Sequence, residues 1–347
     1  MVTEQTPPDS ICILRLSAIG DVTHVIPVIN AIKSQWPNIK ITWICGALEY
    51  KLLSCLPGVR FIVFKKHAGL KSYLDVHKQL GGERFDILLH MHASARANML
   101  SVFIRARTKL GWDDDNARDL HRLFIDKKIS AVKARHQVQG YLEFARTIGI
   151  EIDQPVWDFP VPPEAMEFAR HYLPDASRVL LISPCSSHDL RNWKAEQYAA
   201  VADFAIEKMG MTVVLSGGPG ELDSAMGKAI DNVMVNKSIN LIGKDTLLQL
   251  SAMLKCADVV ISPDSGPIHI ANAVGTKAIG LYACTKSRRS GPYNSLDLCV
   301  DKYDEAARVF LNKDADTLAW NNKIELDGVM DLIKVDEVTD KLDQCFK

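Results

Sequence analysis

Several features that would place a chain in a narrow class are absent from this 347-residue sequence. Its eight cysteines form no Cys-x-x-Cys pair, and several, such as Cys12 and Cys45, stand in apolar runs. That pattern is typical of core residues in a reducing compartment rather than of disulfides or zinc ligands. No segment reaches the about 18 apolar residues of a membrane span, and residues 1–10 are polar, without an apolar signal core. We therefore expect a cytoplasmic protein.

The chain also lacks a charge excess of either sign. Its formal net charge of −1 at pH 7 argues against general nucleic-acid binding. The charges are unevenly spread, because residues 1–160 carry 21 Lys and Arg against 16 Asp and Glu, whereas residues 161–347 carry 20 against 26. A basic first half suits an acidic ligand or an anionic membrane surface, and ordinary scatter over two solvated surfaces explains the numbers equally well.

What the sequence does contain is a regular alternation of short apolar strands and helices. With this length and 47% apolar residues, two domains are expected. Four prolines within residues 154–163 favour a stiff linker there. We place an N-terminal domain at 1–158, a C-terminal domain at 159–320, and at 321–347 an end helix that packs back on the first domain. Both domains are expected to be α/β, with parallel sheets.

The most informative stretch is Ser-Pro-Asp-Ser-Gly-Pro-Ile-His at 262–269. A buried strand is predicted before it and a small-residue helix after it. Ligands of open parallel sheets bind at the carboxyl ends of strands, and a helix start suits a phosphate. Ser265 and Gly266 would let a diphosphate approach the backbone, while Asp264 would accept hydrogen bonds from sugar hydroxyls. The alternative is that Asp264 or Ser265 merely caps the helix.

Two other loops of the second half also follow predicted strands, at residues 183–188 and 216–221. Parallel strands joined by helices share a direction, so all three loops should open at one sheet edge. Glu221 could accept a bond from a ribose diol, and Arg191 and Lys194 could neutralise a diphosphate. Together the loops predict a nucleotide pocket.

The first half begins with an apolar strand, the loop Ser-Ala-Ile-Gly-Asp at 17–21 and a helix over 22–36. The loop has too few glycines for the dinucleotide fingerprint GxGxxG. It offers a hydroxyl at Ser17, a flexible Gly20 and a carboxylate at Asp21. Here too a helix cap is the plain alternative for the carboxylate.

Charged side chains recur further along the first half. Basic residues, among them Lys65, Arg96 and Arg122, could meet an anionic acceptor, although a solvated face is the commoner explanation. The acidic run at 113–115 is compatible with a metal-chelating Asp-x-Asp signature. It lies in a polar loop rather than after a clear strand, which favours solvated charge, and we expect no metal.

These motifs resemble glycosyltransferase family 9, the ADP-heptose:lipopolysaccharide heptosyltransferases. The resemblance is carried by residues 13–22, 189–193 and 262–269 and extends over about residues 11–295. It implies the GT-B fold, two Rossmann-like domains with the active site in the cleft between them. It also implies ADP-heptose as the donor substrate, with no cofactor and no chelated metal.

The resemblance further implies that Asp21 is the general base, taking the proton from an acceptor hydroxyl as that oxygen attacks the anomeric carbon of the heptose with inversion. The implied acceptor is the Kdo sugar of Kdo-lipid A, and a lipid-linked acceptor suggests peripheral contact with the cytoplasmic face of the inner membrane. Arg191 stands where heptosyltransferase I usually has a lysine, and His269 either faces the diphosphate or is a half-buried histidine with its own partners. The residues assigned to the donor are Ser186, Ser187, Arg191, Lys194, Glu221, Asp245, Asp264, Ser265, Gly266 and His269. Those assigned to the acceptor are Ser17, Gly20, Lys65, Arg96 and Arg122.

Other hypotheses stay open. One is a transferase that acts on a later core heptose, and another is a sugar-nucleotide epimerase on the same GT-B scaffold, which would convert its substrate without an acceptor. The third is a non-catalytic module that binds a nucleotide sugar.

Overall fold

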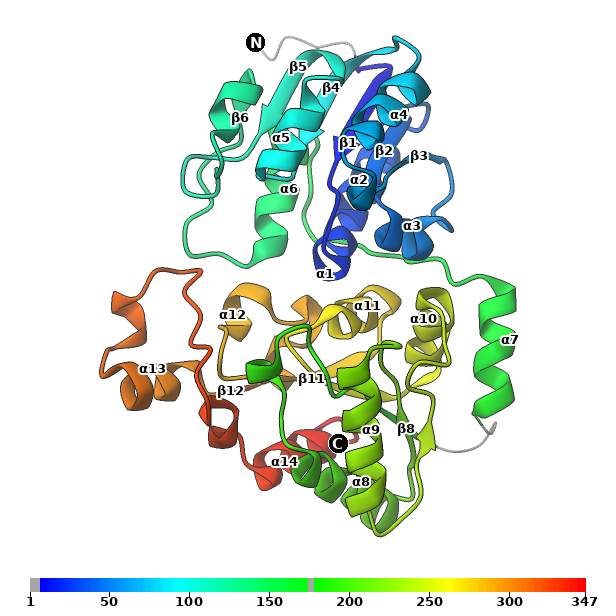
Figure 1. The fold of residues 1–347 in the computed structure, drawn as a ribbon, viewed down its shortest axis with the longest axis vertical. Coiled ribbons are helices and arrows are strands. Elements are labelled where there is room, and N and C mark those ends of the chain that lie inside the picture. The colour runs from blue at the N-terminus through cyan, green and yellow to red at the C-terminus, as the bar shows by residue number, and fades with distance from the viewer. Residues whose placement is uncertain (1–6, 174–177) are drawn as a thin grey trace. The chain divides into compact units, whose positions relative to one another are not determined.

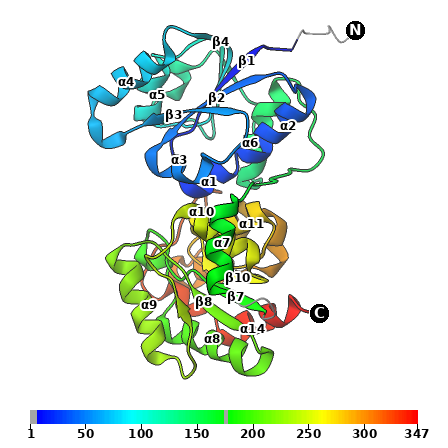
Figure 2. The same ribbon diagram turned by 90° about the vertical axis from the view of Figure 1, so that its right-hand side faces the viewer.

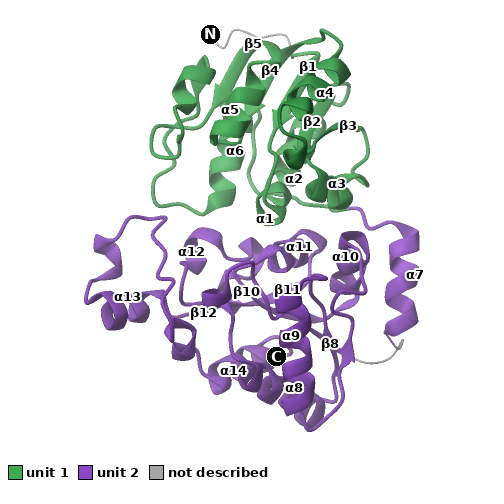
Figure 3. Cartoon of the chain, in the orientation of Figure 1, with its two compact units in different colours: residues 1–159 green, residues 160–347 purple. Residues whose placement is uncertain are grey.

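The computed structural model describes residues 7–173 and 178–347, so residues 1–6 of the polar leading segment lie outside the described residues. The chain divides into two compact units, residues 1–159 and 160–347 (Figure 3). Each unit is built around a parallel six-stranded sheet (Figure 1). No helix among the described residues is long and apolar enough to cross a membrane.

The N-terminal unit alternates strands with helices throughout. Its strands are β1 (Ser10–Leu14), β2 (Lys40–Gly46), β3 (Val59–Phe64), β4 (Arg84–His90), β5 (Arg105–Gly111) and β6 (Lys127–Lys128). Its helices are α1 (Ile19–Thr23), α2 (Ile26–Gln35), α3 (Ala47–Leu53), α4 (Leu70–Leu80), α5 (Ala95–Ser101) and α6 (Gln137–Thr147), with 3₁₀ turns η1 (Lys66–Ala68) and η2 (His121–Phe124). The sheet order is β3-β2-β1-β4-β5-β6.

The C-terminal unit follows the same scheme. Its strands are β7 (Val179–Ile182), β8 (Thr212–Leu215), β9 (Ile239–Asn240), β10 (Val259–Pro263), β11 (Lys277–Tyr282) and β12 (Val300–Asp301). Its helices are α7 (Pro163–Tyr172), α8 (Ala195–Met209), α9 (Glu221–Val233), α10 (Leu247–Cys256), α11 (Gly266–Val274), α12 (Ser287–Ser290), α13 (Tyr303–Leu311) and α14 (Val335–Gln344). The 3₁₀ turns are η3 (Asp189–Arg191), η4 (Tyr293–Leu298), η5 (Ala315–Thr317) and η6 (Val329–Leu332). The sheet order is β12-β11-β10-β7-β8-β9.

The central strands are apolar on both sides because helices cover both faces of each sheet. All residues of β7 and β10 are buried, as expected for parallel strands packed on two sides. In the N-terminal unit α4 and α5 lie on one face of the sheet and α2 and α6 on the other (Figure 2). Helix α8 buries Tyr198, Val201, Ala202 and Ala205, a spacing of three and four residues that puts them on one stripe.

Both sheets have the strand order of a doubly wound fold, in which the order reverses beside the first strand. The reversal lies between β1 and β4 in one unit and between β7 and β10 in the other. Ligands of such sheets bind outside the carboxyl ends of the strands at this point. Of the loops that the sequence singled out, those at residues 17–21, 183–188 and 262–266 lie at the carboxyl ends of β1, β7 and β10. The prediction of Rossmann-like α/β units is therefore confirmed.

Two features of the fold differ from the sequence-based expectation. The helix predicted over 22–36 is two helices, α1 and α2, because Pro27 has no N–H to donate and starts a new helix, so Asp21 lies inside α1. The end helix, expected on the first domain, is α14, which packs against α8, β11 and β12 of its own unit and buries Val338 and Leu342 in that core.

Candidate active site

Asp21 lies in the first turn of α1, and its carboxylate is held from several sides. Arg15 Nη2 pairs with Asp21 Oδ2, and the backbone N–H of Ala18 donates to the same oxygen at 3.2 Å. The other oxygen, Oδ1, accepts from Gln137 Nε2 at 2.5 Å and from Tyr141 Oη at 3.1 Å, both on α6. The Ala18 contact is the capping role that the sequence left open, but three side-chain partners go beyond what a cap requires. They fix the orientation of the carboxylate.

Burial and charge act on Asp21 in opposite directions. Burial alone would raise the pKa of a carboxyl group. The Arg15 guanidinium, His24 and the hydrogen bonds from Ala18 and Tyr141 outweigh it and lower the pKa of Asp21 to about 2. The group is therefore ionised at neutral pH, as a proton acceptor must be. Its side chain is still 22% exposed, so a substrate hydroxyl can reach it.

Arg15 is the cation that organises this part of the N-terminal unit. Its Nη1 donates to the Met91 carbonyl at 2.8 Å, and its guanidinium lies 5.5 Å from the centre of the Tyr141 ring. In the loop after β4, His92 Nδ1 accepts the N–H of Leu16 at 3.1 Å. Burial and the charge of Arg15 lower the pKa of His92 to about 3, so the ring is neutral and its Nε2 carries the proton. A neutral donor thus lies close to the Arg15–Asp21 pair.

The residues that the sequence assigned to the acceptor are Ser17, Gly20, Lys65, Arg96 and Arg122. The first two lie in the loop and first turn that carry Asp21. Lys65 and Arg96 are exposed, and the charge of Arg96 is near enough to help lower the pKa of His92. Arg122 is 67% exposed and pairs with Asp114 at 3.3 Å. Of the three cations, Arg96 thus lies close enough to act on His92, and Arg122 is paired with a local carboxylate.

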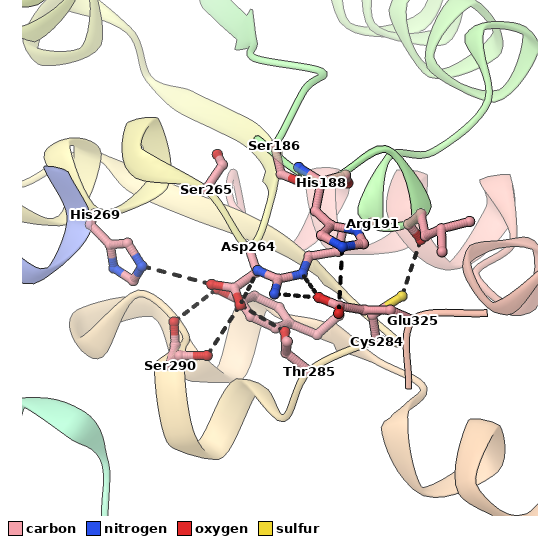
Figure 4. A network of polar contacts seen from close by, with 12 residues as sticks. Ser186, His188, Arg191, Asp264, Ser265, His269, Cys284, Thr285, Ser290 and Glu325 are labelled. Carbon is pink, nitrogen blue, oxygen red and sulfur yellow. Dashed lines mark hydrogen bonds and ion pairs between the residues drawn. The ribbon is translucent and has the colours of Figure 1, made fainter. Parts of the chain in front are cut away.

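Asp264 follows β10 directly and is the centre of a polar network in the C-terminal unit (Figure 4). Its Oδ2 accepts from Thr285 Oγ1 at 2.9 Å and from Ser290 Oγ at 3.4 Å. His269 Nε2 lies 3.9 Å from Oδ1, and Arg191 Nη1 lies 3.7 Å from Oδ2. Burial would raise the pKa of Asp264, but His269, Thr285 and Arg191 lower it below its usual range. Asp264 is thus a half-buried, ionised acceptor.

The start of α11 carries no side-chain cap. Ser265 precedes the helix, yet its hydroxyl lies 2.8 Å from Ser262 Oγ and makes no capping bond. The Asp264 carboxylate bonds to Thr285 and Ser290 instead. The first N–H groups of a helix lack intrahelical partners, so this helix start retains the donors that suit a phosphate. The capping alternative for Asp264 and Ser265 is not what the side chains do.

Arg191, at the end of η3, is shared by two carboxylates (Figure 4). Its Nε and Nη2 donate to Glu325 Oε1 at 2.8 and 2.5 Å. The second oxygen, Glu325 Oε2, lies 3.6 Å from His188 Nε2. Burial would raise the pKa of Glu325, but Arg191 outweighs it and lowers that pKa. Arg191 and Asp264, which the sequence placed on different loops, are brought together by the sheet.

The other residues assigned to the donor either form hydrogen bonds within their own loops or lie at the surface. Ser186 Oγ accepts the N–H of His188 at 3.1 Å, and Asn192 Oδ1 accepts the N–H of Ser186 at 2.6 Å, so both shape the loop after β7. The amide Nδ2 of Asn192 is buried and has no hydrogen-bond partner within the described residues. Ser187 is exposed. Lys194 is exposed and binds Asp331 at 2.6 Å, a hydrogen bond that raises the pKa of the lysine.

Two of the donor residues lie near the ends of β8 and β9. Glu221 is the exposed first residue of α9. Asp245 accepts from Ser216 Oγ at 2.9 Å, and burial raises the pKa of this carboxyl group to about 6. These polar groups lie beside the loops after β8 and β9, and the hydrogen bond of Asp245 is made to Ser216 rather than to the Asp264 network.

The acidic run at 113–115 is engaged within its own loop. Asp113 is buried and accepts from the backbone of Asn116 and Val132. Asp114 pairs with Arg122 and Lys128, and Asp115 pairs with Lys133. Within residues 7–173 and 178–347, no cluster of three or more His, Cys, Asp or Glu side chains could hold a metal ion.

Sequence reasoning missed several side chains of these networks. Arg15 could have been found, because it is a lone cation at the end of an apolar strand within residues 13–22. Gln137 and Tyr141 lie four residues apart, on one face of a helix, but that spacing alone identifies no partner. Glu325 stands in a polar segment in which neither a motif nor a hydrophobic period would have indicated its role.

The chain matches the family model of glycosyltransferase family 9 (heptosyltransferase) over residues 73–316. It is 37% identical over 331 residues to the lipopolysaccharide core heptosyltransferase OpsX of Haemophilus influenzae, covering 95% of each chain. Its fold is similar to that of a glycosyl transferase family 9 protein from Veillonella parvula, with a TM-score of 0.80, 21% identity and 97% of each chain covered. It is also similar to E. coli heptosyltransferase WaaC with ADP, with a TM-score of 0.68, 21% identity, and 87% of this chain and 99% of the other covered.

Proposed function

The chain belongs to glycosyltransferase family 9, and from that premise we propose that it moves L-glycero-D-manno-heptose from ADP-heptose to the Kdo sugar of Kdo-lipid A, with inversion. The 37% identical relative is named a lipopolysaccharide core heptosyltransferase, which supports this donor and acceptor class. The observation that carries the proposed mechanism is Asp21, an ionised, partly exposed carboxylate fixed by three side chains.

In the proposed reaction an acceptor hydroxyl attacks the anomeric carbon of the heptose and ADP leaves with the bonding electrons. The hydroxyl proton passes to Asp21. A carboxylate with a pKa of about 2 is a weak base, but the hydroxyl becomes strongly acidic as its oxygen bonds to the carbon, so the transfer is downhill late in the reaction. The same low pKa lets protonated Asp21 lose its proton to solvent before the next turnover. A positioned base contributes about 10²–10⁴-fold in rate.

The donor is assigned to the C-terminal unit. The free N–H groups at the start of α11 would bind the diphosphate, with Arg191 as the nearby cation. A helix terminus by itself contributes about 0.3–1 kcal/mol at exposed sites, so the arginine is needed for tight binding. Asp264 would accept hydrogen bonds from heptose hydroxyls, because it is ionised and Thr285 and Ser290 both donate to Oδ2, whereas His269 Nε2 lies 3.9 Å from Oδ1.

The test is turnover of ADP-heptose with Kdo-lipid A by the purified protein and by Asp21→Asn. The variant should lose about 10²–10⁴-fold in kcat and bind ADP as wild type does. Asp86→Asn is the matched control, since Asp86 is also a hydrogen-bonded carboxylate with an arginine partner and stands near the start of β4. An Asp21→Asn enzyme of normal activity would exclude the base assignment.

Two further arms of the same assay separate the related functions. With a heptosylated core acceptor in place of Kdo-lipid A, faster turnover would assign the enzyme to a later heptose. With ADP-heptose and no acceptor, formation of an isomeric nucleotide sugar would indicate an epimerase.

We further propose peripheral contact with an anionic membrane through the outer faces of α4 and α5. These helices cover the same side of the N-terminal sheet. Leu70 and Leu74 on α4 and Met99 and Val102 at the end of α5 are exposed. Exposed cations accompany them: Lys65, Lys66, Lys71, Lys78 and Arg96. Apolar side chains flanked by lysine and arginine suit a bilayer surface, where each cation adds about 1 kcal/mol.

Co-sedimentation with vesicles tests this contact. Wild type should bind vesicles rich in phosphatidylglycerol and release them at high salt, and should bind phosphatidylcholine vesicles weakly. Leu70→Ser with Leu74→Ser should weaken binding without loss of turnover on a detergent-dispersed acceptor. Equal binding by this double variant would contradict the proposed contact.

A further inference from the structure

Glu325 is the carboxylate that holds Arg191, and it comes from a distant part of the chain. It lies between η5 and η6, 134 residues after Arg191. Both hydrogen bonds that Arg191 makes to it end on one oxygen, Oε1, and the other oxygen faces His188 on the same loop as Arg191. Figure 4 shows Arg191 between Asp264 and Glu325. Glu325 therefore contacts the loop after β7 at two points.

The two sides of the Arg191 guanidinium have different surroundings. Glu325 takes the side formed by Nε and Nη2. On the opposite side, Nη1 lies 3.7 Å from Asp264 Oδ2, which is too long for a hydrogen bond. The nitrogen that faces the sugar-binding carboxylate is thus the one that Glu325 does not hold. A carboxylate that blocked the donor would be expected on that nitrogen instead.

We propose that Glu325 is a positioning residue for the donor: it fixes Arg191 so that Nη1 is presented to the diphosphate beside Asp264. The proposal rests on the proposed function and adds to it a residue from outside the motif regions. An unrestrained arginine loses much side-chain freedom when it binds a ligand. A guanidinium that is already fixed by Glu325 loses less, so the bound state is reached at a lower cost.

Calorimetric titration of the full-length protein with ADP tests the proposal directly. Glu325→Ala should raise the Kd for ADP about 3- to 10-fold, the range that corresponds to ordering one long side chain on binding. Glu325→Gln keeps an oxygen that can accept from Nε and Nη2, so its Kd should stay within about 2-fold of wild type. If Glu325 instead competed with the diphosphate for Arg191, both variants would bind ADP more tightly, and that result would overturn the proposal.

A double-mutant cycle tests whether the effect of Glu325 on ADP binding depends on Arg191. In the Arg191→Ala background, Glu325→Ala should leave the Kd for ADP unchanged, because the side chain it positions is gone. An undiminished effect in that background would contradict the proposal. Kinetics with the full donor provide a second readout: Glu325→Ala should raise KM for ADP-heptose more than it lowers kcat, and Glu325→Gln should restore KM.

Glu337→Ala is the matched control for folding. Glu337 is a half-buried glutamate of the same unit that pairs with Lys302 at 2.6 Å and also accepts the N–H of Lys334 at the start of α14. Its loss should lower Tm at least as much as the loss of Glu325 while leaving the Kd for ADP unchanged. Wild-type protein that fails to bind ADP would overturn the proposed function together with this inference. Wild type and Glu325→Ala binding ADP equally well would overturn the inference alone.

Discussion

Replacing Arg15 with glutamine should raise the pKa of Asp21 and make its titration visible. Arg15 pairs with Asp21 Oδ2 and supplies the largest of the effects that lower this pKa. Glutamine keeps a polar side chain at the position but removes the charge. Arg15→Lys keeps the charge and loses the second nitrogen, which in wild type donates to the Met91 carbonyl.

The expected magnitude follows from the balance at Asp21. In wild type, favourable interactions outweigh burial and bring the pKa from the ordinary 3.8 to about 2, a difference of about 2 kcal/mol. Without Arg15, burial is opposed only by the remaining hydrogen bonds and by His24. The pKa should then rise by about two units, to or above its ordinary value.

Two measurements follow this change. In protein labelled with ¹³C at aspartate carboxyl groups, the Asp21 resonance is assigned by its absence in Asp21→Asn and is titrated in wild type and in the Arg15 variants. The profile of kcat/KM against pH reports the same group in the free enzyme. Wild type should be flat down to the acid limit of folding, whereas Arg15→Gln should show an acid limb at higher pH. Arg15→Lys should stay close to wild type.

Arg60→Gln is the control for general loss of a cation, since Arg60 pairs with Glu83 at 2.7 Å elsewhere in the same unit. Thermal unfolding of each variant at every pH used establishes that the folded protein is being titrated. If the Asp21 resonance moves at the same pH in Arg15→Gln as in wild type, then Arg15 does not set the ionisation of the proposed base.

Three other substitutions test separate parts of the structure. Tyr141→Phe removes one hydrogen bond to Asp21 and should lower kcat about 3- to 10-fold, as expected for about 1 kcal/mol, with the Kd for ADP unchanged; an equal loss of ADP binding would show a wider disturbance. Trp193→Ala removes a buried side chain whose Nε1 donates to the Ile333 carbonyl, and should cost about 3–5 kcal/mol in chemical denaturation; a cost below about 1 kcal/mol would contradict this packing. Because burial raises the pKa of Asp245 from 3.8 to about 6, the folded state holds the proton more tightly and the free energy of unfolding falls as pH rises through that interval, by at most about 3 kcal/mol. Asp245→Asn should abolish that fall, so its Tm should exceed that of wild type at neutral pH and approach it near pH 4; a constant difference in Tm would refute the assignment.

The fold class could be predicted from simple features of the sequence. Apolar strands alternating with helices predict parallel sheets, and the proline-rich residues 154–163 favour a linker. Where the prediction failed, the observed structure is determined by a single local residue or by a contact between distant parts of the chain. Pro27 divides one expected helix, an effect visible in the sequence. Helix α14 packs against α8 through the buried side chains of Val338 and Leu342. Helical periodicity shows which face of α14 is apolar but does not identify α8 as its partner.

The two carboxylates of the candidate site could be predicted from the sequence, whereas most of the side chains that hold the site together could not. Asp21 and Asp264 follow strands at the point where each sheet reverses order, so topology alone places each carboxylate at the edge of its own sheet where ligands bind. Their partners come from elsewhere: Gln137 and Tyr141 from α6, and Glu325, which holds the predicted Arg191, from the far end of the chain. Contacts over such sequence distances depend on how helices and loops pack, and a single sequence read by itself contains no record of them.

The same arrangement recurs at both sites and explains why each needs an arginine. A carboxylate at the end of a buried strand would lose charge through burial, since desolvation raises its pKa. In the N-terminal unit Arg15 counters this by direct pairing with Asp21, whereas in the C-terminal unit Arg191 stands 3.7 Å from Asp264 and is itself held by Glu325. Direct pairing suits a proposed base, which has to be ionised and oriented before the acceptor hydroxyl arrives. A guanidinium held by a second carboxylate keeps a nitrogen for an incoming anion, so in the proposed reaction Asp264 would stay charged while Arg191 binds the donor.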